Sequence, residues 1–82
     1  MNEKPKRNFP DDGTDYLLSI DEAASRLRTS RSIVVRLVQA KLLKTLRFRR
    51  EHRIPKSVLN EFIKEHVGED VYELLESVEA AA

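Results

Sequence analysis

Arginine and lysine are concentrated in the middle third of the chain, where they could neutralise phosphate groups and contact base edges. Residues 26–56 contain eleven of these cations and one acidic residue, Glu51. A cation that pairs with a nucleic-acid phosphate releases a counterion, and an arginine can bond two acceptors on guanine. In the stretch SRSIVVRLVQAKLLKTLRFRREHRIP (30–55) the cations alternate with aliphatic residues. This composition predicts a polyanion-binding surface built from folded elements.

The rest of the chain is acidic, so the overall charge conceals the basic segment. Residues 1–25, 26–56 and 57–82 carry net charges of −3, +10 and −6, which together give the net charge of +1. Charge acts on a ligand where it is placed, and not as a sum over the chain. The near-neutral total therefore does not argue against nucleic-acid binding by the middle segment.

Enzymatic and metal-binding chemistry find little support in the sequence. The chain has no cysteine, and its two histidines, His52 and His66, have no nucleophile or ligand cluster near them. Ser19, Ser30 and Ser57 are each explained as helix starts. We therefore expect no catalytic residue, no metal and no cofactor.

The N-terminus lacks an apolar signal-peptide core, and no apolar run approaches the roughly 18 residues of a membrane span. A cytoplasmic protein is expected.

The periodicity of the apolar residues predicts two short helices after a flexible N-terminal tail of residues 1–15. Ser19 and Glu22 have the spacing of a capping box, which predicts a first helix over residues 21–27. Ser30 is a second candidate N-cap, for a helix over residues 31–40. One face of this second helix is aliphatic, with Val34 and Leu37 at its centre.

The opposite face of the second helix contains the first group of candidate DNA-contacting residues. It combines guanidinium, hydroxyl, amide and aliphatic side chains: Arg31, Ser32, Val35, Arg36 and Gln39. An ordinary solvated face would account for the same composition. A helix that reads base edges in the major groove would also need these donors, acceptors and small apolar contacts.

Beyond Leu43 the apolar period changes from 3.6 to 2, which predicts a β-hairpin. Leu46, Phe48 and Ile54 are expected to face the core. The turn RREH lacks the glycine or asparagine of a tight turn, so a loop of four or five residues is expected. The hairpin supplies the second group of candidate DNA-contacting residues: Arg47, Arg49, Arg50, His52 and Arg53.

Two further helices are predicted after Pro55. The first extends to about His66 on an apolar stripe of Leu59, Phe62, Ile63 and Val67, with Gly68 as a candidate C-cap. The second, over residues 70–80, has four aliphatic residues at helical spacing (Val71, Leu74, Leu75, Val78) and an acidic opposite face. This amphipathic helix could fold back on the core, or it could meet a second copy or another protein.

Two short helices, a β-hairpin and a third helix, in this order, form a winged helix-turn-helix. The segments SIDEAASRL, SRS with Val34, Arg36 and Leu37, and RFRREHRIPKSVLNEFI resemble the excisionase-type, MerR-like winged helix-turn-helix family. The resemblance implies a mainly α fold with a small β-hairpin over residues 16–67, to which residues 68–82 add a C-terminal helix. It also implies that the second helix is a recognition helix and that residues 47–53 form the wing. Family members often have glycine at the positions of Arg28, Lys41 and Arg49, and an aromatic residue at that of Val35.

The resemblance implies double-stranded DNA as the partner. Members are often phage or mobile-element excisionases, which bend attachment-site DNA and direct an integrase toward excision. Others are small transcription regulators. Both classes need the same kinds of residues to contact the DNA grooves, so these residues do not distinguish an excisionase from a regulator. An integrase partner and self-association on DNA are expected for an excisionase. A protein-only adaptor with a basic face is a further alternative. Binding to a membrane surface is disfavoured because the cations continue into a hairpin.

Overall fold

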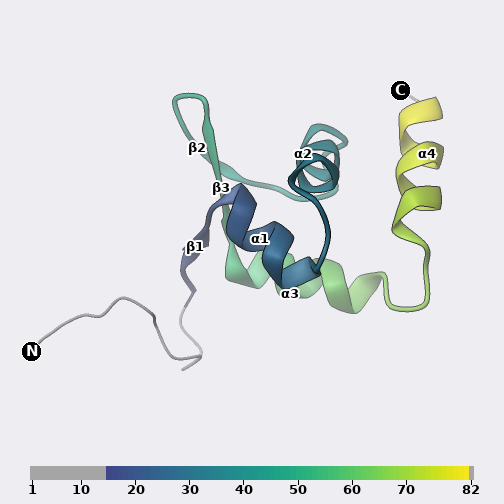
Figure 1. The fold of residues 1–82 in the computed structure, drawn as a ribbon, viewed down its shortest axis with the longest axis horizontal. Coiled ribbons are helices and arrows are strands. Elements are labelled where there is room, and N and C mark those ends of the chain that lie inside the picture. The colour runs from purple at the N-terminus through teal and green to yellow at the C-terminus, as the bar shows by residue number, and fades with distance from the viewer. Residues whose placement is uncertain (1–14, 82) are drawn as a thin grey trace, which may run out of the picture.

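The computed structural model describes residues 15–81 and contains four helices and a small antiparallel sheet (Figure 1). The order of elements along the chain is β1 (Leu17–Leu18), α1 (Ile20–Leu27), α2 (Arg31–Gln39), β2 (Leu46–Phe48), β3 (Glu51–Pro55), α3 (Lys56–Glu65) and α4 (Val71–Ala81). The predicted mainly α winged helix-turn-helix with an added C-terminal helix is confirmed. The predicted N-terminal tail lies outside the described residues except for Asp15.

A single apolar core joins the elements from β1 to α4. Its buried members come from both helices of the helix-turn-helix, from the sheet and from α3 and α4: Leu18, Ile20, Ala23, Ala24, Ile33, Val34, Leu37, Leu43, Ile54, Leu59, Phe62 and Leu75. The two alanines of α1 are small, so α2 can approach closely. This core holds α2 with its opposite face turned outward.

The capping box predicted at the start of α1 is confirmed. The Ser19 hydroxyl accepts a hydrogen bond from the Glu22 amide at 3.1 Å, and the Glu22 carboxylate accepts one from the Ser19 amide at 2.8 Å. Each side chain thus satisfies a backbone donor that the first turn leaves unpaired. The Ser30 hydroxyl likewise accepts from the Ile33 amide at the start of α2. Both helix starts are fixed by local sequence.

Both helices end on a cationic residue in the left-handed conformation. Arg28 follows α1 with φ 57° and Lys41 follows α2 with φ 64°. After α2, the Lys41 amide donates to the Val38 carbonyl at 3.0 Å and the Leu42 amide donates to the Leu37 carbonyl at 2.9 Å. This pair of bonds is the Schellman motif, in which glycine usually occupies the left-handed position. The positions at which the family often has glycine are therefore the strained ones.

The sheet has a strand that the sequence patterns did not predict. Its order is β1-β3-β2, and β1 pairs antiparallel with β3 through Leu17 opposite Pro55 and Leu18 opposite Ile54. A two-residue strand is too short to produce a detectable alternation of apolar residues. Its pairing places β3 at the centre of the sheet and ties the N-terminal end of the domain to the hairpin.

Asp15 caps α3 from the other end of the domain. Its Oδ1 accepts a bond from the Ser57 amide at 3.0 Å, and its Oδ2 accepts one from the Ser57 hydroxyl at 2.6 Å. The hydrogen bond from the Ser57 side chain is the main reason that the pKa of Asp15 lies below its usual value. The start of α3 therefore depends on a residue that precedes β1.

The predicted hairpin turn and the predicted inward residues of β2 are wrong. Phe48 pairs with Glu51, so the turn contains only two residues, Arg49 and Arg50, and Arg49 adopts φ 63°. Leu46 pairs with Arg53, which is the neighbour of buried Ile54. Adjacent residues of a strand point to opposite faces, so Leu46 and Phe48 point away from the core. They are 52% and 53% exposed.

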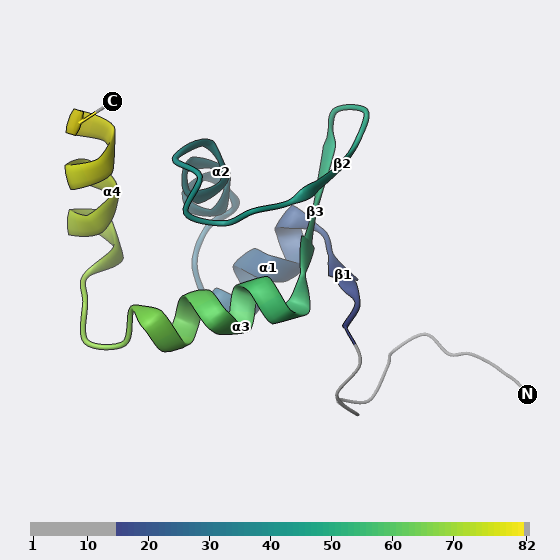
Figure 2. The ribbon, with the colours of Figure 1, turned by 180° about the vertical axis from the view of Figure 1, so that it is seen from behind.

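The two C-terminal helices differ from prediction in detail. In α3, Leu59 and Phe62 are buried as expected, but Ile63 and Val67 are exposed. The helix ends at Glu65, close to the predicted end, but its C-cap is His66 and not the candidate Gly68, which adopts φ 94° in the following turn. The chain then turns, and α4 stands at a steep angle to α3 (Figures 1 and 2). Leu75 of α4 is fully buried, so this helix folds back on the core.

Candidate nucleic-acid interface

The outward face of α2 carries the five side chains predicted for it. Arg31, Ser32 and Gln39 are exposed, and Val35 and Arg36 are partly buried, whereas Ile33, Val34 and Leu37 on the other face are buried. The Ser32 hydroxyl lies 3.0 Å from the Ser30 hydroxyl, next to the N-cap. The predicted division of α2 into a core face and an outward face is confirmed.

A groove of about 490 Å³ separates α2 from the hairpin. From α2 it is lined by Arg31, Val35, Val38 and Gln39, and from the hairpin by Arg50, Glu51 and His52; Ser19, Ile20 and Asp21 close one end. Five of the ten candidate DNA-contacting residues thus meet at one surface feature. It lies between the two elements that would both face a duplex.

Two carboxylates at this groove partly neutralise its positive charge. Asp21 accepts a hydrogen bond from Arg31 at 2.9 Å, and both side chains remain mostly exposed. Glu51 accepts one from Arg53 at 3.0 Å. Exposed ion pairs of this kind are weak and exchange readily. The pairing of Asp21 with Arg31 could not be read from the sequence, because the two residues belong to different helices.

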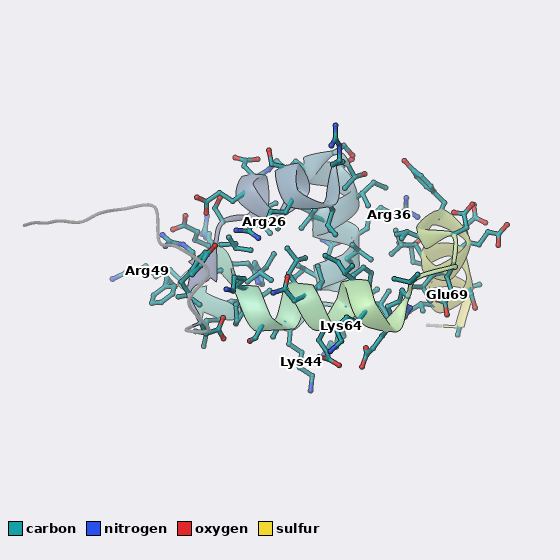
Figure 3. The ribbon with its side chains drawn as sticks, turned by 90° about the horizontal axis from the view of Figure 1, so that it is seen from below. Arg26, Arg36, Lys44, Arg49, Lys64 and Glu69 are labelled. Atoms are coloured by element: carbon teal, nitrogen blue, oxygen red, sulfur yellow. The ribbon has the colours of Figure 1, made fainter. Side chains whose placement is uncertain are left out.

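The hairpin presents its cations in two different ways. Arg49 and Arg50 form the exposed two-residue turn, and Arg47 is exposed on β2 opposite His52. Figure 3 shows the labelled Arg49 side chain pointing away from the helices. Arg53 instead packs its guanidinium 5.5 Å from the centre of the Phe48 ring. The Nε of Arg53 is buried and, among the described residues, has no hydrogen-bond partner.

His52 is held in place by a hydrogen bond within the hairpin. Its Nδ1 lies 2.7 Å from the Thr45 hydroxyl, and the ring is partly buried. The bond fixes the direction of the ring and leaves Nε2 for another partner. The contact with Thr45 could not be predicted from the sequence, because it depends on the register of the hairpin.

Comparison with known families agrees with this arrangement. A family model described as a helix-turn-helix domain matches residues 17–67, which is more than half of the chain. The chain belongs to this helix-turn-helix family. Its members are excisionase-like DNA-binding domains, as the sequence patterns predicted. Domains of this family are typically not enzymes. Comparison with curated proteins and with solved structures gives no significant match.

The matched helix-turn-helix domain extends from β1 to just beyond α3, so α4 is an addition to it. Residues 15–81 include no helix that is long and apolar enough to cross a membrane. DNA binding is thus supported by the family and by an exposed α2 beside a basic hairpin.

Arg36, like Ser32, is not among the α2 residues that line the groove. It faces α4, where its Nε and Nη2 donate to the two carboxylate oxygens of Glu79 at 2.9 and 2.7 Å. Figure 3 shows Arg36 on the side of α2 next to α4. The hydrogen bonds raise the pKa of Arg36 and lower that of Glu79. The helix-turn-helix domain and its added helix are therefore joined by a bidentate ion pair that the sequence did not predict.

Proposed function

We propose that the protein binds double-stranded DNA in a sequence-dependent manner, with α2 in the major groove and the hairpin along the backbone. The observation that supports this most is the position of the outward face of α2 beside the hairpin with its two-arginine turn, within a domain of a DNA-binding family. We assign this activity to residues 16–67 and treat residues 68–82 as an appended helix.

The proposal gives α2 and the hairpin different roles. A helix about 10–12 Å wide fits the major groove, where base edges carry distinct patterns of donors and acceptors. Arg31, Ser32 and Gln39 would then meet base edges, because they are exposed, and Val35 would join them from the groove, although it packs partly against the core. Arg36 would contact a phosphate from one flank of the helix.

The hairpin would supply affinity more than specificity. Arg47, Arg49 and Arg50 are exposed cations on the hairpin, which suits phosphate contacts. His52 and Arg53 are partly buried, so they would support the hairpin and meet the backbone through the atoms that remain accessible.

A salt titration with three variants tests the proposal. If about five to seven phosphates are contacted, log K against log salt should have a slope of roughly −5 to −6. Arg31→Ala should change the preference among duplex sequences, at a cost of about 1–3 kcal/mol at the base pair it contacts. Arg49→Ala with Arg50→Ala should weaken all duplexes similarly and flatten the slope. Lys64→Ala, an exposed α3 cation far from the groove, is the control and should change little.

The absence of duplex binding at low salt would refute the proposal and favour a protein-only adaptor. A hairpin variant that changed the preferred sequence, with nonspecific affinity intact, would reverse the assigned roles of helix and hairpin.

For the cellular role we propose an excisionase that acts with an integrase, working in the bacterial cytoplasm and on the nucleoid when bound. A small MerR-like transcription regulator is the second candidate. The resemblance of the helix-turn-helix domain supports both. An in vitro excision reaction with the integrase encoded nearest to the protein separates them. An excisionase should stimulate excision and self-associate on adjacent sites, whereas a regulator should do neither and should bind promoter DNA.

A further inference from the structure

The added helix α4 lies along the flank of α2 that faces away from the hairpin. In both views α2 stands between the hairpin on one side and α4 on the other (Figures 1 and 2). The Arg36–Glu79 pair joins the two helices directly. The outward face of α2 is therefore bordered by a basic element on one flank and by an acidic helix on the other, with Glu73, Glu76 and Glu79 in its sequence.

The ion pair occupies one of the two edges through which the Arg36 guanidinium can bind a phosphate in a bidentate manner. Nε and Nη2 form the fork with which arginine binds a carboxylate or a phosphate, and both atoms are bonded to Glu79. Glu79 thus occupies Arg36 in the way a DNA phosphate would. While the pair is closed, the Nε–Nη2 edge of Arg36 is not available to a DNA phosphate.

The dimensions of DNA make the closed position of α4 incompatible with full insertion of α2. The major groove is about 12 Å wide, and one helix with its side chains is about 10–12 Å wide. The phosphates that line the groove would therefore pass along both flanks of α2. On one of these flanks they would meet a packed second helix with a carboxylate directed at Arg36.

We propose that α4 is an autoinhibitory strap, which competes with a DNA phosphate for Arg36 and moves off the flank of α2 when DNA binds. The inference rests on the proposed entry of α2 into the major groove. It assigns a function to the acidic C-terminal helix, which lies beyond the matched domain.

The described contacts that attach α4 are the buried Leu75, the partly buried Val71 and Leu74, and the ion pair with Arg36. Among the residues of α4, all of them described, Leu75 is the one that is fully buried. The side chains of Arg36 and Glu79 are 36% and 43% exposed, so water and a phosphate can compete for them. Gly68 has φ 94° in the linking turn, with no neighbouring atom within 4 Å of an added Cβ. Release of α4 therefore requires Leu75 to leave the core, while the glycine in the linking turn leaves the backbone free to reorient.

The central test compares two charge-removing variants of the full chain, Glu79→Gln and Glu73→Gln. Both remove one negative charge from α4, but only Glu79 is bonded to Arg36. Both variants weaken the repulsion between α4 and DNA, so any increase in duplex affinity from this cause is the same in both. On a 20-base-pair duplex at fixed salt, Glu79→Gln should bind about two- to five-fold more tightly than Glu73→Gln, since a partly exposed ion pair is modest in strength.

The removal of Arg36 should abolish this difference. In the Arg36→Gln background, Glu79→Gln should increase duplex affinity no more than Glu73→Gln does. Arg36→Gln alone should weaken duplex binding. Hydrogen exchange supplies a second readout: in the intact protein, the amides of α4 should lose protection when saturating duplex is added. Unchanged or increased protection of these amides from exchange would refute the proposed displacement of α4.

The outcomes separate this inference from the proposed function. If the wild type binds duplex with the expected salt slope and Glu79→Gln is no tighter than Glu73→Gln, the strap is refuted and the DNA-binding proposal stands. If neither the wild type nor any variant binds duplex at low salt, the proposed function fails and the inference fails with it.

Discussion

Replacement of Lys41 by glycine should stabilise the protein. Lys41 adopts φ 64° at the end of α2, and its side chain is exposed. The left-handed conformation costs a residue with a Cβ about 1–2 kcal/mol. Glycine avoids this cost but loses about 0.5–1 kcal/mol through the greater freedom of the unfolded chain. The expected net gain is about 0.5–1 kcal/mol, or about 2–8 °C in Tm for a domain of this size.

Thermal and urea denaturation of the full chain, followed by circular dichroism at 222 nm, measure this gain. Lys41→Ala is the matched control, because it removes the same side chain but keeps the Cβ that causes the strain. Only the glycine variant should be stabilised. Since Arg28 ends α1 in the same conformation, Arg28→Gly should add a similar increment. Equal stability of Lys41→Gly and Lys41→Ala would show that backbone strain at this position is negligible.

Three further changes test other parts of the structure. Leu75→Ala should lower the free energy of unfolding by about 2–4 kcal/mol, because Leu75 is fully buried; an unchanged urea midpoint would show that α4 does not pack on the core. Phe48→Ala should change stability by less than about 0.5 kcal/mol, since its ring is 53% exposed, whereas Ile54→Ala on the opposite face of the hairpin should cost about 2–4 kcal/mol. Equal losses from the two variants would contradict the register. The pKa of Asp15 is lowered by its bonds to Ser57, so the stabilisation from its carboxylate is present above the unfolded pKa of about 3.8 and is lost as the pH falls through the folded pKa. In urea titrations from pH 5 to pH 2, Asp15→Asn should therefore be less stable than the wild type at pH 5 and should approach it at low pH; a constant difference across this range would exclude the linkage.

The sequence was sufficient to predict those parts of the fold that depend on local interactions. Capping residues such as Ser19 and Ser30 act over three residues, so the helix starts follow from composition and spacing. The outward face of α2 followed from helical periodicity alone. Helical periodicity also predicted the amphipathic α4, although the sequence left open whether Leu75 packs on the core or on a partner.

The errors arose where side-chain placement depends on distant parts of the chain. The inward face of a strand is set by register, and a two-residue turn at Arg49 places Leu46 and Phe48 on the outer face. The turn was predicted to be longer because Arg49 has a Cβ, which disfavours but does not forbid φ 63°. The Arg36–Glu79 bond joins residues 43 positions apart, and no pattern along the chain encodes such a pair.

The pairing of β1 with β3 determines the order in which the chain can assemble. A short turn joins α1 to α2, so these two helices can meet as soon as both have formed. Leu17 and Leu18 must instead wait for Ile54 and Pro55, which lie at the other end of the domain. Because closure of a longer loop costs more conformational entropy, contacts of this kind form later than local ones. During synthesis the paired helices can therefore form early, and the pairing of β1 with β3 follows after β3 has been made.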